Sequence, residues 1–294
     1  MQVGSVKQIW SYPVKSLGGE ILDEALVDGF GMIGDRNWCL VDTATGDLAS
    51  GKSVPRLMNL QARYQQGSPT SRLYADDVPD VEVIFPDGRV ITGQEAASAA
   101  ISEYTGKSLR LHPLEAPDML EHYRMSAPLD ESRLASIFNI RPGEDGPDLS
   151  DYEPELIGLL SEFSAPPGTY YDMFPLHLVT SASVEHFTDL SGANFDPRRF
   201  RPSIYVESAS GSNGLADFEW VGRNLRIGEL ELAVKARTIR CSMPSRGQEQ
   251  YGLEASPATT EAIYQTTNRY LGVYLSVVTP GRFKTGDAVS LIQA

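Results

Sequence analysis

The 294-residue chain has only two cysteines, Cys39 and Cys241, and no run of about 18 apolar residues. Two thiols are too few for a disulfide framework, a four-thiolate zinc site or a protein-bound iron–sulfur cluster. Without a long apolar run, we expect no membrane-spanning helix. The N-terminus also lacks the basic and apolar regions of a signal peptide, so we expect a cytoplasmic protein that does not engage a membrane.

Basic residues are scarce as well. The 25 lysines and arginines stand against 39 acidic residues, which gives a net charge of −14. Such a surface repels phosphate backbones, so we expect no binding to nucleic acid. The chain contains no Gly-x-Ser-x-Gly or Gly-x-Gly-x-x-Gly motif, and its four histidines show no metal-ligand spacing. Neither a serine hydrolase nor a Rossmann dehydrogenase is therefore supported.

Short segments rich in Val, Ile, Leu and aromatic residues alternate with Gly, Asp and Pro, which predicts a β-rich α+β fold. Residues 224–235 alternate apolar and polar side chains around Gly228 and Glu229, a pattern typical of a hairpin with one buried face. Further strands are expected at 6–12, 37–41, 81–85, 109–112, 176–180 and 204–206. Helices are expected at 95–104, 152–161, 183–190 and 259–270.

Prolines concentrate between residues 113 and 169, together with an acidic patch at 144–151. This composition favours an extended connector with little core of its own. We therefore expect an N-terminal domain at 1–115, a connector at 116–170 that forms part of the interface, and a C-terminal domain at 171–294.

Cys241 is the first candidate for chemistry, because four basic residues lie within the twelve-residue window 235–246 of this acidic chain. Nearby positive charge favours the thiolate, which is the form that attacks or binds a metal. The alternative is an ordinary half-buried cysteine among solvated charges. Cys39 lies between Trp38 and Leu40 on an apolar strand, so we expect it to be a small core residue.

Two further groups are candidates for an anion site. Lys15 and Ser16 follow a strand and a proline-containing turn, and Arg36 comes about twenty residues later. Lys, Ser and Arg at strand ends are residue types that hold phosphate. Three arginines at 198–201 precede another strand, and Arg201 is the last of them. In both places a solvated turn or edge is the alternative.

Several longer motifs occur along the chain. Near the N-terminus these are YPVKSLGGE and GMIGDRNWCLVD. Later segments are PLHLVTSASV, FDPRRFRPSIYVE, FEWVGRNLRIGELELAV, TIRCSMPSRG and LGVYLSVVTPGRFKTGDAVSLI. Together they resemble the MOSC proteins, the molybdenum cofactor sulfurase C-terminal family: the first two are similar to the family's N-terminal β-barrel module, and the later ones to the MOSC domain itself, in the family's order. The resemblance spans the chain apart from the proline-rich connector.

The resemblance implies an N-terminal β-barrel module, a C-terminal MOSC β-barrel and a bound molybdenum–molybdopterin cofactor. It implies that Cys241 is the metal ligand and catalytic residue. The cofactor-binding positions that it implies are Lys15, Ser16, Arg36, Thr180, Ser181, Arg201, Ser203 and Arg240. Family members with both modules include amidoxime-reducing proteins and related bacterial reductases. This chain departs from the family in having Ser203 where Asn is common and Ile239 where a small polar residue is common.

The function that follows is a molybdenum-dependent oxidoreductase that reduces N-hydroxylated or N-oxygenated small molecules. Its electrons are expected from a separate donor protein, because the chain has no flavin motif and no ferredoxin-type cysteine cluster. One alternative is a sulfur-transfer or cofactor-carrier protein that uses Cys241. Another is a protein that keeps the fold and has lost the metal, as the two departures suggest.

Overall fold

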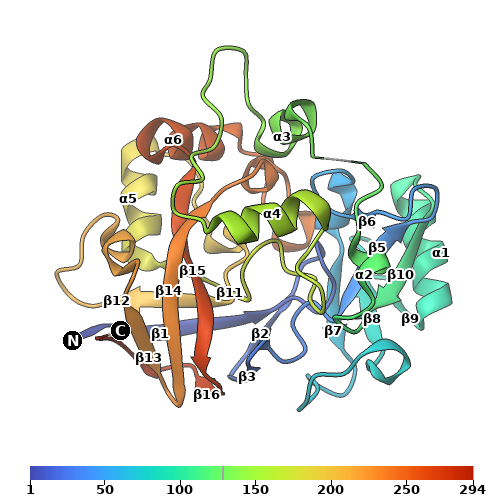
Figure 1. Cartoon of the computed structure of the whole chain (residues 1–294), viewed down its shortest axis with the longest axis horizontal. Helices are drawn as coiled ribbons and strands as arrows, with labels where there is room; N and C mark the ends of the chain where they lie inside the picture. Colours follow the sequence, from blue (N-terminus) through green and yellow to red (C-terminus); the bar gives the residue numbers. More distant parts are fainter. Residues whose placement is uncertain (128, 294) are drawn as a thin grey trace.

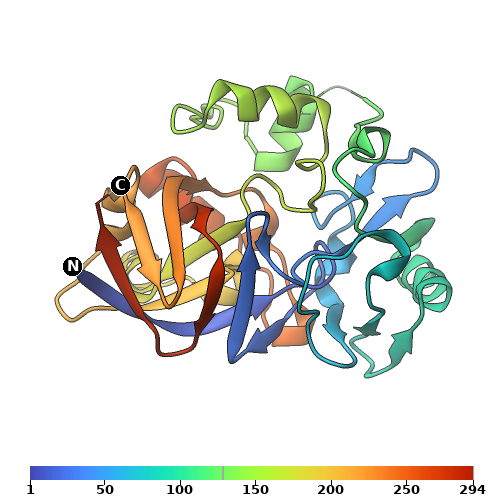
Figure 2. The ribbon, with the colours of Figure 1, turned by 60° about the horizontal axis from the view of Figure 1, so that its bottom comes forward.

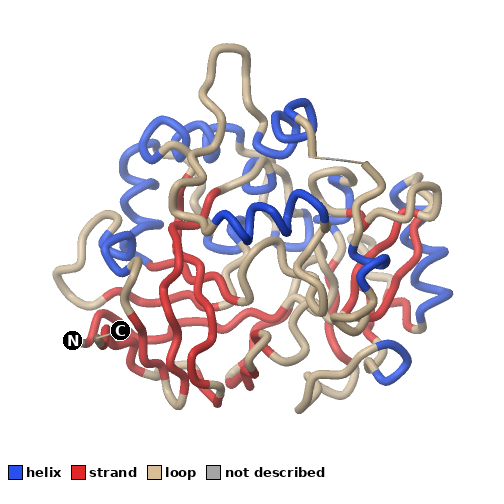
Figure 3. The backbone as a smooth tube through the Cα atoms, viewed as in Figure 1, coloured by secondary structure: helices blue, strands red, loops and turns tan. Residues whose placement is uncertain are grey.

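The computed structural model describes residues 1–127 and 129–293, and within these ranges seven strands close into a β-barrel (Figure 1; Figure 3). The barrel closes where β1 pairs with β12. In order around the barrel the strands are β12 (Ile204–Ser208), β11 (Leu176–Thr180), β15 (Tyr270–Thr279), β14 (Leu230–Ile239), β13 (Asn224–Ile227), β17 (Ala288–Ile292) and β1 (Gln2–Ser11). The predicted β-rich α+β class is therefore confirmed.

β13 and β14 form the hairpin that the alternating pattern predicts. Ile227 pairs with Leu230, so Gly228 and Glu229 make a two-residue turn. Gly228 has a φ of 57°, the left-handed conformation that such a turn requires at its first position. Alternate side chains of β14 are buried and fill the barrel core together with those of β13. The period of the sequence thus fixes which face of the hairpin lies inward.

The first strand of the chain belongs to the C-terminal barrel. β1 pairs antiparallel with β12 on one side and with β17 on the other, and Figure 2 shows it running along the barrel. β2 (Glu20–Leu22) continues this sheet, while β3 (Glu24–Asp28) pairs with β4 (Gly31–Met32) and β16 (Gly281–Lys284). The expected boundary at residue 115 therefore does not separate two independent sets of strands.

Residues 38–113 build a second unit, called here the N-terminal unit. Two three-stranded sheets form it: β10 (Leu109–Pro113), β5 (Trp38–Asp42) and β6 (Leu48–Ala49), then β7 (Gln61–Tyr64), β8 (Val81–Ile84) and β9 (Val90–Thr92). Helix α1 (Gln94–Thr105) buries Ala97 and Ile101 against their common core and ends at Gly106, which adopts a φ of 71°.

Helices α5 (Ser181–Ser191) and α6 (Pro257–Thr267) pack together through Phe187 and Ile263. Both were expected from the sequence. The second ends three residues earlier than expected, because Asn268 adopts a left-handed φ of 51° and Tyr270 already begins β15. Short 3-10 helices lie at Pro55–Asn59, Ala75–Asp77, Pro197–Phe200, Ala216–Trp220, Met243–Ser245 and Glu249–Tyr251.

The connector is not the extended segment that its prolines suggested. It contains α2 (Leu120–Tyr123), α3 (Glu131–Phe138) and α4 (Pro154–Glu162), of which only the last was expected. Figure 1 and Figure 2 show α4 lying over the region between the barrel and the N-terminal unit. Pro154 is the first residue of α4, where its missing N–H costs no hydrogen bond. None of the helices in the described ranges has the length and apolar character that a membrane crossing requires.

Two stacked histidines join the start of the connector to the N-terminal unit. The rings of His112 and His122 lie with centroids 4.6 Å apart. The Tyr170 hydroxyl donates to Pro113 O at 2.7 Å, so His122 Nε2 donates to the hydroxyl oxygen at 2.8 Å. Burial lowers the pKa of both histidines, and the neighbouring His112 helps to bring that of His122 to about 4. Both rings are therefore neutral at pH 7.

This pair makes stability depend on pH. Because the folded-state pKa of His122 lies below the ordinary value of 6.5, the unfolded chain binds a proton that the folded chain excludes. The contribution of the neutral His122 ring to the free energy of unfolding is complete above pH 6.5 and is lost as the pH falls toward 4. His122→Gln keeps a hydrogen-bond donor and removes the titration, so its Tm should fall less between pH 7 and pH 4.5 than that of the unmodified protein. Equal falls in calorimetric scans would contradict the assignment.

Candidate functional site

A cavity of about 440 Å³ lies where the barrel, the N-terminal unit and the connector meet. Of the nine site residues predicted from the sequence, seven line it: Lys15, Ser16, Arg36, Arg201, Ser203, Arg240 and Cys241. They come from positions more than 200 residues apart in the chain. The cavity has the size of a small-molecule or cofactor site.

Three of these lining residues have an unusual backbone. Ser16, Arg36 and Arg201 have φ values of 71°, 52° and 51°. This left-handed region is costly for any residue with a Cβ atom and is enriched at functional sites. The surrounding hydrogen bonds hold these residues there: Arg36 N, for example, donates to Tyr12 O at 2.9 Å.

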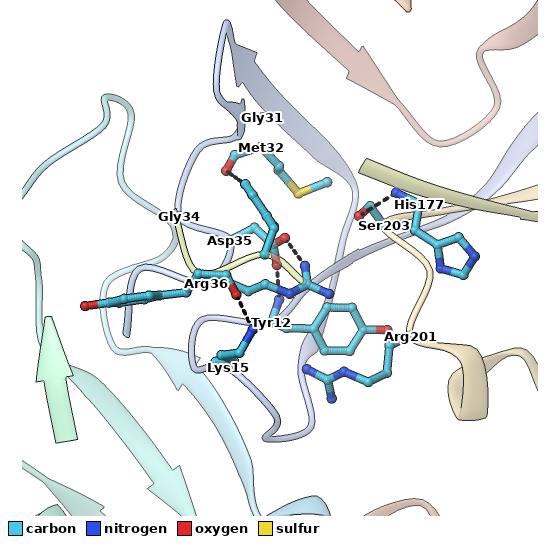
Figure 4. A network of polar contacts seen from close by, with 12 residues as sticks. Tyr12, Lys15, Gly31, Met32, Gly34, Asp35, Arg36, His177, Arg201 and Ser203 are labelled. Carbon is cyan, nitrogen blue, oxygen red and sulfur yellow. Dashed lines mark hydrogen bonds and ion pairs between the residues drawn. The ribbon is translucent and has the colours of Figure 1, made fainter. Parts of the chain in front are cut away.

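The two arginines share the ring of Tyr12, which lies between their guanidinium groups (Figure 4). The guanidinium carbon of Arg36 is 5.1 Å from the ring centroid, and that of Arg201 is 4.1 Å away. Asp35 accepts a hydrogen bond from Tyr12 N at 2.7 Å and forms an ion pair with Arg36. Although burial lowers the pKa of Arg36, the Asp35 carboxylate outweighs it and raises that pKa. Arg36 is therefore a firmly held cation.

The guanidinium group of Arg201 has fewer partners than that of Arg36. Its Nη1 donates to Leu17 O at 2.5 Å, but its buried Nη2 finds no acceptor in residues 1–127 and 129–293. Burial lowers its pKa, against the opposing effect of Tyr12. A buried donor without an acceptor costs free energy, which a ligand oxygen or nitrogen would recover.

Lys15 lies in the same cavity and is nearly buried. Its Nζ donates to Tyr170 O at 2.8 Å and to Asp172 Oδ1 at 2.9 Å. The other carboxylate oxygen of Asp172 is 3.6 Å from Lys52 Nζ. Burial lowers the pKa of Lys15 despite Asp172, whereas for Lys52 the carboxylate outweighs burial and raises the pKa. One carboxylate thus holds two lysines at the cavity wall.

Sequence reasoning missed Lys52 and Asp172, because neither residue belongs to a recognisable motif or a cluster of charged residues. The backbone at Gly18 and Gly19 packs closely against other parts of the protein. A Cβ on Gly19 would lie 2.0 Å from Ser11 O.

His177, which sequence reasoning did not single out, also lines the cavity. Arg240 Nη1 donates to His177 Nε2 at 3.3 Å, and Arg240 Nη2 donates to Phe200 O at 2.9 Å. Burial and the charge of Arg240 hold the pKa of His177 well below its usual range, so its ring is neutral. His177 N in turn donates to Ser203 Oγ at 3.4 Å. Arg240 Nε, like Arg201 Nη2, has no acceptor in the described ranges.

Cys241 lies two residues after the end of β14 and is a half-buried free thiol. Met243 N donates to its Sγ at 3.5 Å. The expected basic cluster around this thiol is only partly present. Lys235 and Arg237 pair with Glu153 and Asp151 of the connector and do not line the cavity, so that part of the prediction was wrong.

Arg199 supports the loop that follows Cys241. It is 1% exposed, and its guanidinium donates to the carbonyl oxygens of Pro244 at 3.3 Å, Arg246 at 3.2 Å and Glu254 at 2.7 Å. Of the arginines expected to form an anion site, Arg198 instead pairs with Asp196, and Arg201 lines the cavity.

Thr180 and Ser181 do not line the cavity, contrary to the expectation for cofactor-binding residues. Thr180 is the N-cap of α5 and accepts a hydrogen bond from Ser183 N, while Ser181 Oγ accepts one from Ser208 N. The Thr180 hydroxyl therefore caps α5, and the Ser181 hydroxyl attaches the start of this helix to β12. Cys39 is fully buried, and burial raises its pKa to about 12, which confirms a core role.

The chain is similar in sequence to curated proteins and in structure to a solved protein. "Mitochondrial amidoxime-reducing component 1" from Homo sapiens is 24% identical over 316 residues, which cover 99% of this chain and 84% of that protein. "Mitochondrial amidoxime reducing component 2" from Bos taurus is 24% identical over 319 residues, covering 98% and 83%. Among solved structures, the YUAD protein from Bacillus subtilis is similar at a TM-score of 0.44 and 10% identity, covering 99% of this chain and 97% of that chain.

Family models match both parts of the sequence. Residues 3–108 match the MOSC N-terminal beta barrel domain, and residues 166–290 match the MOSC domain. The two matches leave out most of the connector. The chain therefore belongs to the MOSC family, with the N-terminal beta barrel domain preceding the MOSC domain.

Proposed function

We propose that the cavity holds a molybdenum–molybdopterin cofactor and that the chain reduces N-hydroxylated or N-oxygenated small molecules. The observation that carries the proposal is the presence of one free thiol, Cys241, in the same cavity as six lysine and arginine side chains. The names of the relatives, which are amidoxime-reducing components, favour this activity over others of the fold.

The residues at the cavity fit such a cofactor. Molybdopterin brings a phosphate and a dithiolene, so the protein need add only one soft thiolate and a set of cationic donors. Cys241 would bind the metal, and Lys15, Ser16, Arg36, Arg201, Ser203 and Arg240 would hold the pterin and phosphate. The buried Arg201 Nη2 and Arg240 Nε, which lack acceptors in the described part of the chain, suit a ligand rich in oxygen and nitrogen.

The reaction consumes two electrons and two protons. They cleave the N–O bond of an amidoxime and release the amidine and one water molecule. When bound, the cofactor supplies the two-electron oxygen-transfer chemistry. The neutral ring of His177 orients Arg240 through a hydrogen bond, and the cationic side chains keep the anionic cofactor in place. A separate electron-donor protein would supply the electrons.

Replacement of Cys241 tests the metal ligand. Cys241→Ala should lose nearly all bound molybdenum and keep the Tm that the unmodified protein has without its cofactor, because the thiol is only half buried. The matched control is Cys39→Ala, which should keep molybdenum and lower the Tm, because it removes a core side chain. Molybdenum and oxidised pterin per chain are measured after purification from a host that makes molybdopterin.

The outcomes separate the alternatives. Unmodified protein that carries neither molybdenum nor pterin contradicts the proposal and favours a chain that has lost the metal. Bound molybdenum without reduction of benzamidoxime by reduced methyl viologen favours a carrier or sulfur-transfer role for Cys241.

A second variant tests the cationic donors. Arg201→Gln removes the charge that lies over Tyr12 and should lower pterin content by about tenfold or more, as expected when a charge-assisted contact to a buried anion is lost. Arg198→Gln is the matched control, because Arg198 is paired with Asp196 and does not line the cavity. Its pterin content should match that of the unmodified protein. Equal losses in the two variants would assign the effect to folding rather than to cofactor contact.

A further inference from the structure

The side chains that line the cavity fall into two chemically different groups. One group comprises the cationic side chains and Cys241. The other comprises apolar side chains, many of them from the connector and the segment that follows it. A polar, anionic cofactor matches the cationic group and leaves the apolar group unmatched. A second ligand is therefore needed to explain it.

Part of the apolar group comes from one face of each of two helices. On α3, Leu134, Ile137 and Phe138 are spaced three and four residues apart, and on α4, Ile157 and Leu160 are spaced three apart. All five line the cavity, and neither helix contains a fully buried residue. These faces, called here the apolar wall, stay half-buried because they face the cavity rather than a packed core.

Part of the wall has no core contact. Among the described residues, Leu134, Ile137 and Leu160 pack against none of the hydrophobic core clusters, whereas Leu159, adjacent to Leu160 on α4, packs against the core of the N-terminal unit. An amphipathic helix normally buries its whole apolar face. Here the three side chains without a core contact all line the cavity.

The wall is fixed in place beside the thiol. Ser242 N, next to Cys241, donates to Ile137 O at 3.0 Å. Before α4, Arg237 binds Asp151 through two hydrogen bonds of 2.6 and 2.7 Å, and the Tyr152 hydroxyl donates to Arg237 O at 2.6 Å. The connector is thus attached to β14, the strand that carries Cys241 at its end.

Building on the proposed function, we propose that the apolar wall selects N-hydroxylated substrates with an uncharged, bulky apolar body, such as an aryl group. The N–OH head lies toward Cys241 and the cationic side chains, and the apolar body lies against α3 and α4. A charged or strongly polar body would lose its hydration against this wall without gaining partners. Polar N-hydroxylated base analogues are therefore poor substrates.

The test compares two uncharged probes that share one head group, benzamidoxime and acetamidoxime. Their binding to the full chain, purified from a host that makes molybdopterin, is measured by isothermal titration calorimetry. Benzamidoxime should bind about tenfold or more tightly, because its phenyl ring buries far more apolar surface than a methyl group. Equal dissociation constants would overturn the proposal.

Two wall variants and one control locate the effect. Leu160→Asn and Leu134→Asn should each weaken benzamidoxime binding by about fivefold or more and change acetamidoxime binding by less than about twofold. Leu159→Asn makes the same change one residue away, on the side of α4 that packs against the core. It should lower the Tm and keep the benzamidoxime dissociation constant. Equal losses for both probes in both wall variants contradict the proposal.

Turnover with reduced methyl viologen keeps the two proposals apart. If benzamidoxime binds with the expected preference and neither probe is reduced, the reductase function fails and the wall's selectivity stands. If both probes are reduced with the same kcat/KM and the wall variants alter neither, the wall proposal fails and the reductase function stands.

Discussion

The guanidinium groups of Arg199, Arg201 and Arg240 have no carboxylate at salt-bridge distance in the described part of the chain, although the protein has a net charge of −14. Taking such charges out of water is costly unless other groups replace the solvent. Backbone carbonyl oxygens and the ring of Tyr12 do so here, and they leave the charge itself uncancelled. Each arginine therefore connects separate segments of the chain through hydrogen bonds and keeps part of the cavity lining cationic.

The barrel topology explains how these residues meet. Ile9 of β1 pairs with Ile204 of β12, which places the turn after β1 beside the Arg–Pro segment before β12. β11 pairs with both β12 and β15, and β14 pairs with β15, so that His177 and the thiol-bearing end of β14 reach the same end of the barrel. One ring of hydrogen-bonded strands thus sets the relative positions of side chains that come from both halves of the sequence. The assignment of β1 to the C-terminal barrel is a requirement of the site.

Patterns with a short period were predictable, and contacts between distant residues were not. Alternation predicted the β13–β14 hairpin and its buried face. The same alternation explains the error at Lys235 and Arg237: both lie on the β14 face that meets the acidic connector, although they are near Cys241 in sequence. The seven cavity residues that were predicted were found largely because their motifs resemble those of a known family. Lys52 belongs to no such motif, and only the fold brings it to Asp172.

The connector resolves an apparent conflict between an acidic protein and a cationic cavity. Its acidic residues Asp151 and Glu153 pair with cations on the outer side of β14, and Glu144 pairs with Arg269. Its apolar helix faces lie toward the cavity. Had the acidic side chains lined the cavity, they would have neutralised the arginines there and competed with an anionic ligand. The amphipathic spacing of α3 and α4 therefore has an electrostatic effect as well as a packing effect, because the two helices line the cavity with apolar side chains in place of the connector's acidic ones.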